Sequence, residues 1–140
     1  MIGIKYLSTI NIYLDIDGVI LANDKQPALH AEEFIRHLVE HYPVFWLTTH
    51  CRNPGDDPVP TLARFFDAAT VERLTSVQPA YWDVLKTEAI DFSQPFLWFD
   101  DDPLATEREI LAQHGVLDSW VEIDLAKDLH QLHAIIMQLA

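Results

Sequence analysis

Two short apolar runs that end in acids organise this sequence: INIYLDIDGV at residues 10–19 and FLWFDDD at residues 96–102. Both runs are rich in aliphatic and aromatic residues and stop abruptly at carboxylates, as buried parallel strands do where they open into a site. In open α/β sheets, ligands bind at the carboxyl ends of the strands. We therefore expect Asp15, Asp17 and the acids at 100–102 to meet at one sheet edge and to form one metal site.

Strand and helix patterns alternate along the rest of the chain. Short apolar runs predict strands at 10–16, 44–47, 96–99 and 120–123, with a weaker strand at 71–77. Apolar residues at helical spacing predict helices at 31–42, 61–69, 79–90, 104–114 and 125–139. This alternation favours a three-layer, Rossmann-like α/β domain with a mostly parallel central sheet.

Length and composition limit the possible classes of protein. The chain has 140 residues, 49% of them hydrophobic, which predicts one folded domain over residues 1–140. The formal net charge of -13 disfavours nucleic acid and anionic membranes as partners, because both are bound through clustered Lys and Arg. No apolar stretch reaches the roughly 18 residues that a membrane span needs.

The single cysteine and residues 1–10 indicate in which cellular compartment the protein is expected. Cys51 is the only cysteine, so an internal disulfide cannot form and a reducing compartment is expected. Residues 1–10 lack the apolar core and cleavage pattern of a secretory leader, and we expect a cytoplasmic protein. Residues 1–8 are consistent with either an added strand or a loose tail.

Four chemical motifs follow one another in a definite order: Asp15-x-Asp17-Gly18, then Thr48, then Lys86, then the acidic pair at 100–101. This ordered set, over residues 10–102, resembles the haloacid dehalogenase superfamily. Phosphatases of that family carry Asp-x-Asp-Gly after strand one, Ser/Thr after strand two, Lys on a later helix and an acidic pair after strand four. Receiver domains use the same residue types, but they place their acids before both Thr and Lys, so the order here differs from theirs.

The resemblance implies a role for each of these residues in phosphoryl transfer. Asp15 would be the nucleophile that forms an aspartyl-phosphate, and Asp17 would act first as acid and then as base, helped by a modestly raised pKa. Thr48 and Lys86 would bind the phosphoryl oxygens and supply positive charge.

The resemblance also implies a Mg²⁺ ion. Its ligands would be Asp15, the backbone carbonyl of Asp17 and Asp101, with Asp100 in support. Asp102 lies outside this set of ligands, and we expect it to cap a helix that begins near Pro103.

Some polar residues are weaker candidates. Thr49, His50 and Arg52 follow Thr48 and are candidates for binding a substrate anion, although such residues commonly lie on the surface. His130 and His133 have a spacing that can bind metal. No third ligand is evident from the sequence, so we interpret them as a polar helix face.

The intervals between Asp17 and Thr48 and between Thr48 and Lys86 are too short for a large cap domain. The expected function is therefore that of a capless, Mg²⁺-dependent phosphatase acting on a phosphomonoester of unspecified identity. Two alternatives remain open at this stage. One is a non-catalytic binding or regulatory module with the same fold, and the other is a phosphotransferase to an acceptor other than water.

Overall fold

The computed structural model describes residues 10–140, so the expectation for residues 1–8 lies outside the described part of the chain. Five parallel strands form one open sheet in the order β3-β2-β1-β4-β5. The strands are β1 (Asn11–Leu14), β2 (Val44–Trp46), β3 (Gln78–Pro79), β4 (Phe96–Asp100) and β5 (Trp120–Glu122). Each is short. The predicted runs at 10–16, 44–47 and 120–123 each contain one strand, and the run at 96–99 covers β4 except for its last residue, Asp100.

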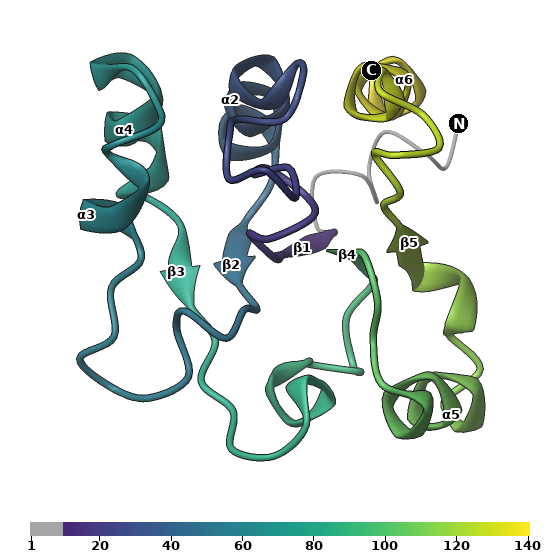
Figure 1. Ribbon diagram of the computed structural model, residues 1–140. Helices are drawn as coiled ribbons and strands as arrows, with labels where there is room; N and C mark the ends of the chain where they lie inside the picture. Colours follow the sequence, from purple (N-terminus) through teal and green to yellow (C-terminus); the bar gives the residue numbers. More distant parts are fainter. Residues whose placement is uncertain (1–9) are drawn as a thin grey trace.

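Helices cover both faces of this sheet, as Figure 1 shows. One face carries α2 (Ala31–His41), α3 (Val59–Leu62), α4 (Ala68–Leu74) and α6 (Gln131–Leu139). The other carries α5 (Ala105–Gln113) and the 3₁₀ turns η1 (Lys86–Ala89) and η2 (Leu117–Ser119). The predicted three-layer, Rossmann-like α/β architecture is confirmed, and within residues 10–140 the strand connections hold only short helices, turns and loops.

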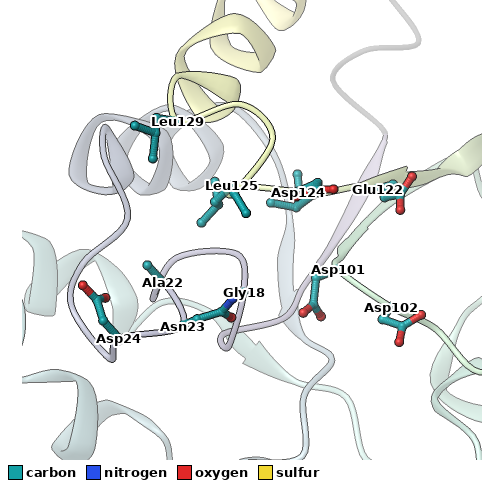
Figure 2. A pocket seen from close by; sticks show the side chains of 12 residues that line it. Gly18, Ala22, Asn23, Asp24, Asp101, Asp102, Glu122, Asp124, Leu125 and Leu129 are labelled. Carbon is teal, nitrogen blue, oxygen red and sulfur yellow. The ribbon is translucent and has the colours of Figure 1, made fainter.

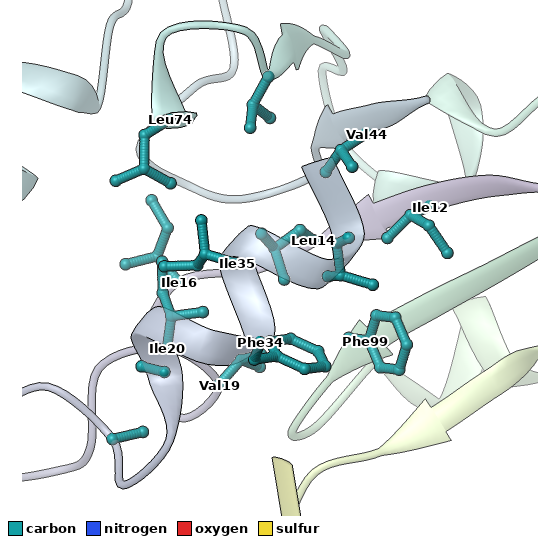
Figure 3. Close-up of a cluster of buried hydrophobic side chains, with 14 of the residues drawn as sticks. Ile12, Leu14, Ile16, Val19, Ile20, Phe34, Ile35, Val44, Leu74 and Phe99 are labelled. Carbon is teal, nitrogen blue, oxygen red and sulfur yellow. The ribbon is translucent and has the colours of Figure 1, made fainter. Parts of the chain in front are cut away.

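Successive side chains of the strands point to opposite faces of the sheet and are buried in two separate hydrophobic cores. In β4, Phe99 points into the core under α2, where its ring meets Phe34 edge to face with centroids 5.2 Å apart. Figure 3 shows this pair beside Leu14 of β1. Trp98 and Tyr13 lie in the second core, under α5 and η1. Burial on both faces explains why these strands read as continuous apolar runs.

The strand order reverses between β1 and β4. The chain proceeds from β1 to β2 and β3 on one side, and then crosses back to place β4 on the other side of β1. Leu14 pairs with Phe99 in this register, so Asp15 and Asp100, which follow them, emerge side by side. Open α/β sheets bind ligands at such a reversal, beyond the carboxyl ends of the strands.

Three expected elements differ from the structure in the segment after β2. The predicted strand at 71–77 is the second half of α4, which starts earlier because the Asp67 side chain accepts a hydrogen bond from Thr70 N at 2.8 Å. The same cap divides the predicted helix at 61–69 into α3 and α4. The predicted helix at 79–90 is instead β3, a loop and η1. The Glu88 carboxylate accepts hydrogen bonds from three consecutive backbone N–H groups at 83–85, which satisfies that backbone outside a helix.

The last predicted helix is shorter than expected. α6 begins only at Gln131, and Leu125 and Leu129 precede it in a loop. Gln131 closes this loop because its side chain accepts from Asp124 N and donates to the Glu122 carbonyl, each at 2.7 Å. Among residues 10–140, no helix combines the length and the apolar character needed to cross a membrane.

Candidate functional site

Lys86 joins the acids at the ends of β1 and β4. Its Nζ lies 3.2 Å from Oδ2 of Asp15 and 2.8 Å from Oδ2 of Asp100, and all three side chains are largely buried. Burial lowers the pKa of Lys86, but the two carboxylates outweigh it and hold that pKa above its ordinary value. The ammonium therefore stays charged between two acids that would otherwise repel each other.

Asp15 is strongly perturbed by its surroundings. Burial raises its pKa to about 7, although the Lys86 ammonium opposes the rise, and the charge of Asp100 adds to it. Its Oδ1 accepts a hydrogen bond from Ile16 N at 2.8 Å, and a hydrogen bond with the buried Thr48 side chain also favours the ionised form. A carboxylate held in this way is fixed in position and poorly solvated.

Asp101 completes a group of three carboxylates. One oxygen each from Asp15, Asp100 and Asp101 lies within 4.8 Å of the other two. Figure 2 shows Asp101 directed towards the loop that carries Gly18. Gly18 has φ +80°, and a Cβ there would lie 2.6 Å from Cγ of Asp101, so the loop approaches this carboxylate only because residue 18 has no side chain.

Asp17 lies in a more exposed position and pairs with the side chains of Lys25 and His50. Lys25 Nζ is 3.0 Å from its Oδ1, and His50 Nε2 is 2.7 Å from its Oδ2. Partial burial raises the pKa of Asp17, but the hydrogen bonds and charges of His50 and Lys25 outweigh this effect and lower it. The expected raised pKa is therefore not found, and the ionised carboxylate is the favoured form.

The structure separates the three candidates that follow Thr48. His50 lies against Asp17, and its backbone N–H donates to Thr48 Oγ1 at 3.3 Å. The guanidinium of Arg52 instead stacks over the Trp82 ring at 4.6 Å and donates to the Asp83 carbonyl. Thr49 is exposed. Of these three, His50 alone bonds to another predicted site side chain.

Two residues with evident roles were not singled out from the sequence. Lys25 reaches Asp17 from the polar loop that follows β1. Buried Glu107 accepts hydrogen bonds from Lys86 N at 2.6 Å and Leu104 N at 2.8 Å, and so ties η1 to the start of α5. A Glu at the third helical position is a recognisable capping signal, but the sequence gives no sign that it also holds Lys86.

The expected helix cap at Asp102 is wrong. α5 begins at Ala105, two residues later than the Pro103 start that was expected, and its first turn is capped by Glu107. Asp102 is exposed and pairs with Arg108 at 2.7 Å. The chain stays extended at Leu104 because its N–H is already satisfied by the Glu107 carboxylate.

A pocket of about 600 Å³ opens beside the three carboxylates. Figure 2 shows it between the loop at 18–24, the acids that follow β4 and the segment from Glu122 to Leu129. Asp101 belongs to both the pocket and the carboxylate group. The other acids of the pocket wall are Asp24, Asp102, Glu122 and Asp124.

The chain matches no protein-family model, no curated protein and no solved structure. The possible chemistry of the site is therefore inferred from the side chains that the structure brings together. Three clustered carboxylates supply hard oxygen ligands for a divalent cation, and Lys86 adds a fixed positive charge. Such a site can bind a metal ion together with an anion such as a phosphoryl group.

Proposed function

We propose that this chain is a Mg²⁺-dependent phosphatase that hydrolyses a phosphomonoester through an aspartyl-phosphate on Asp15. The observation that carries the proposal is the position of Lys86, whose ammonium bonds Asp15 and Asp100 beside the third carboxylate, Asp101. Phosphoryl transfer needs a positioned nucleophile and positive charge around the equatorial oxygens. The buried Thr48 hydroxyl at the same edge adds a hydrogen-bond donor for those oxygens.

The carboxylate group fits a hard divalent cation. One oxygen from each of the three carboxylates lies within 4.8 Å of the other two, and the absence of a side chain at Gly18 lets the loop that carries Asp17 approach Asp101 closely. We assign Asp15, Asp101 and the carbonyl of Asp17 as the residues that would hold Mg²⁺, with Asp100 orienting Lys86. Bound there, the ion would neutralise charge on the phosphoryl oxygens.

The reaction divides into two displacements at phosphorus. In the first, a carboxylate oxygen of Asp15 forms a bond to phosphorus while the ester P–O bond breaks, and the leaving oxygen takes a proton from Asp17. In the second, Asp17 takes a proton from water as the water oxygen attacks phosphorus, and the bond to Asp15 breaks to release phosphate. The lowered pKa of Asp17 favours its ionised form, which is the form that accepts the proton from water in the second step. The proton gained there is the one that Asp17 donates in the first step of the next turnover.

The substrate class follows from the openness of the site. Within residues 10–140 the strand connections form no separate cap, so the pocket beside Asp101 is the space available to the group that carries the phosphate. Its acidic wall and the net charge of -13 disfavour a polyanionic substrate such as a long nucleic acid. A small phosphomonoester with few other negative charges is the best fit.

The decisive experiment measures phosphate release from a panel of phosphomonoesters, in Mg²⁺ and in EDTA, for the wild-type chain, Asp15→Asn and Asp118→Asn. Asp118 is an exposed acid in η2 and serves as the charge-matched control. We expect Mg²⁺-dependent release from the wild type and the control, and loss of it in Asp15→Asn.

Two other results would replace the proposal. If the folded chain binds Mg²⁺ and releases phosphate from no ester in the panel, the non-catalytic module becomes the better account. If phosphate passes to an added alcohol or phosphate acceptor and not to water, the chain is a phosphotransferase.

A further inference from the structure

A second group of metal-ligating side chains lies between α2 and α6, apart from the pocket beside Asp101. His30 precedes α2 and Glu33 lies in its first turn, while His130 precedes α6 and His133 lies in its first turn. One ligand atom from each of His30, Glu33 and His133 lies within 4.8 Å of the other two. None of the four residues lines the pocket at the sheet edge.

The fold assembles this group from two distant parts of the chain. α2 and α6 pack side by side on the same face of the sheet, as Figure 1 shows. His30 Nε2 lies 3.0 Å from His130 Nδ1, and the rings of His30 and His133 have centroids 5.0 Å apart. The ligands that the sequence did not reveal as partners of His133 are therefore His30 and Glu33, at the start of α2.

We propose that His30, Glu33 and His133 form a second metal site, one that takes Zn²⁺. Zinc sites commonly combine imidazole nitrogen and carboxylate oxygen, with three protein ligands and water in the fourth position. Ligands about 2.0 to 2.1 Å from a tetrahedral ion lie roughly 3.3 Å from one another. The three side chains are thus close enough to reach this geometry through small side-chain rotations.

His130 is a positioning residue in this site. An imidazole has two nitrogens, so His30 can bond His130 with one of them and offer the other to the ion. Ligating histidines are commonly oriented in this way by a hydrogen bond from their second nitrogen. His30 also has φ +67°, an uncommon conformation for a residue with a side chain, and it holds the ring next to α6.

Ligand chemistry separates this site from the three carboxylates at the sheet edge. Imidazole nitrogen favours Zn²⁺ and other transition ions, whereas carboxylate oxygen alone suits Mg²⁺. An ion bound by His30 and His133 would link the start of α2 to the start of α6. It would stabilise the folded chain in proportion to its affinity, because the unfolded chain lacks the assembled site.

The test is a calorimetric titration with Zn²⁺ in the presence of excess Mg²⁺, on a chain that carries Asp101→Asn to weaken the other metal site. We expect one Zn²⁺ per chain. His133→Ala removes a ligand and should lower the Zn²⁺ affinity at least tenfold. His130→Ala should lower the Zn²⁺ affinity about 10- to 100-fold, as expected for a residue that orients a metal ligand. His114→Ala is the control, because His114 stacks on Phe92 at 3.8 Å on the opposite sheet face.

A thermal melt gives a second readout that does not depend on enzymatic activity. Zn²⁺ should raise the melting midpoint of the Asp101→Asn chain and of its His114→Ala variant, and should raise that of its His133→Ala variant less at the same Zn²⁺ concentration. His133 is exposed on α6, so alanine there preserves the fold. Equal Zn²⁺ affinity in the His133→Ala and His114→Ala variants, or no binding to the Asp101→Asn chain, would overturn the proposal.

Discussion

The Nζ atom of Lys86 lies 3.2 Å from Oδ2 of Asp15, although Asp15 follows β1 and Lys86 lies in the connection from β3 to β4. The same ammonium lies 2.8 Å from Asp100, so one cation balances two buried acids. Removal of one partner from a buried ion pair leaves an uncompensated charge in a poorly solvated place. The proposed catalytic site is therefore also a determinant of stability.

Lys86→Met should both abolish phosphatase activity and destabilise the metal-free chain. The substitution keeps most of the side-chain volume and leaves two carboxylates without a counter-charge, at a cost of about 3 kcal/mol in the free energy of unfolding. Urea unfolding measures this loss. Mg²⁺ should restore part of it, because the ion supplies positive charge to the same acids. An unchanged unfolding midpoint in EDTA would contradict the ion-pair geometry.

Asp15→Asn should stabilise the metal-free chain at alkaline pH. The pKa of Asp15 is raised from 3.8 to about 7 in the folded state. A raised pKa contributes stability that is present below the unfolded value and is lost as the pH rises through the folded value. In EDTA, the wild type should lose stability between about pH 4 and 7 from this group, while the asparagine variant does not.

Melting experiments at pH 5 and pH 8 measure this difference. At pH 8 we expect Asp15→Asn to exceed the wild type by on the order of 1 to 3 kcal/mol, since the raised pKa of Asp15 already includes the opposing effect of Lys86. Asp118→Asn, which alters an exposed acid, should follow the wild type at both pH values. A variant that is less stable than the wild type at pH 8 would show that the ion pair outweighs the burial of Asp15.

Gly18→Ala should reduce Mg²⁺ affinity and turnover more than it reduces stability. The added Cβ would collide with the Asp101 carboxylate and push a proposed metal ligand out of place. Gly115→Ala is a matched control, since Gly115 has a similar φ of +71° and no atom within 4 Å of the added Cβ. Both variants should lose roughly 1 kcal/mol from backbone strain. Only Gly18→Ala should lose Mg²⁺ binding in a titration.

The sequence predicted four of the five strands of residues 10–140, and the acids at two of their ends, because burial on two faces leaves a simple pattern of unbroken apolar runs. It missed β3, which has only two residues, both exposed. Asp15 and Asp100 follow directly from such runs, and parallel pairing then brings them together. Lys86 was predicted as a site residue from the order of the motifs, and its ammonium lies beside Asp15 and Asp100. The helix on which it was expected does not exist, because the Glu88 side chain replaces helical hydrogen bonds over residues 83–85.

Contacts between side chains from distant segments could not be predicted from the sequence. Nothing in the local pattern indicates that Lys25 and His50 bond Asp17, or that His30 meets His130. These contacts depend on how the loops cross the sheet edge and on which helices become neighbours. Periodicity describes one element at a time and carries no information about such packing.

Glu107→Gln should slow turnover although Glu107 lies outside the proposed reaction centre. Its carboxylate bonds Lys86 N at 2.6 Å and Leu104 N at 2.8 Å, one oxygen to each. Glutamine has one acceptor oxygen, so one of these N–H groups loses its partner, at a cost of about 1 to 3 kcal/mol in stability. We expect kcat to fall with little change in KM, because Lys86 shifts relative to Asp15. Glu109→Gln, on an exposed position of the same helix, is the control. Equal kcat values for the two variants would show that Glu107 stabilises α5 without positioning Lys86.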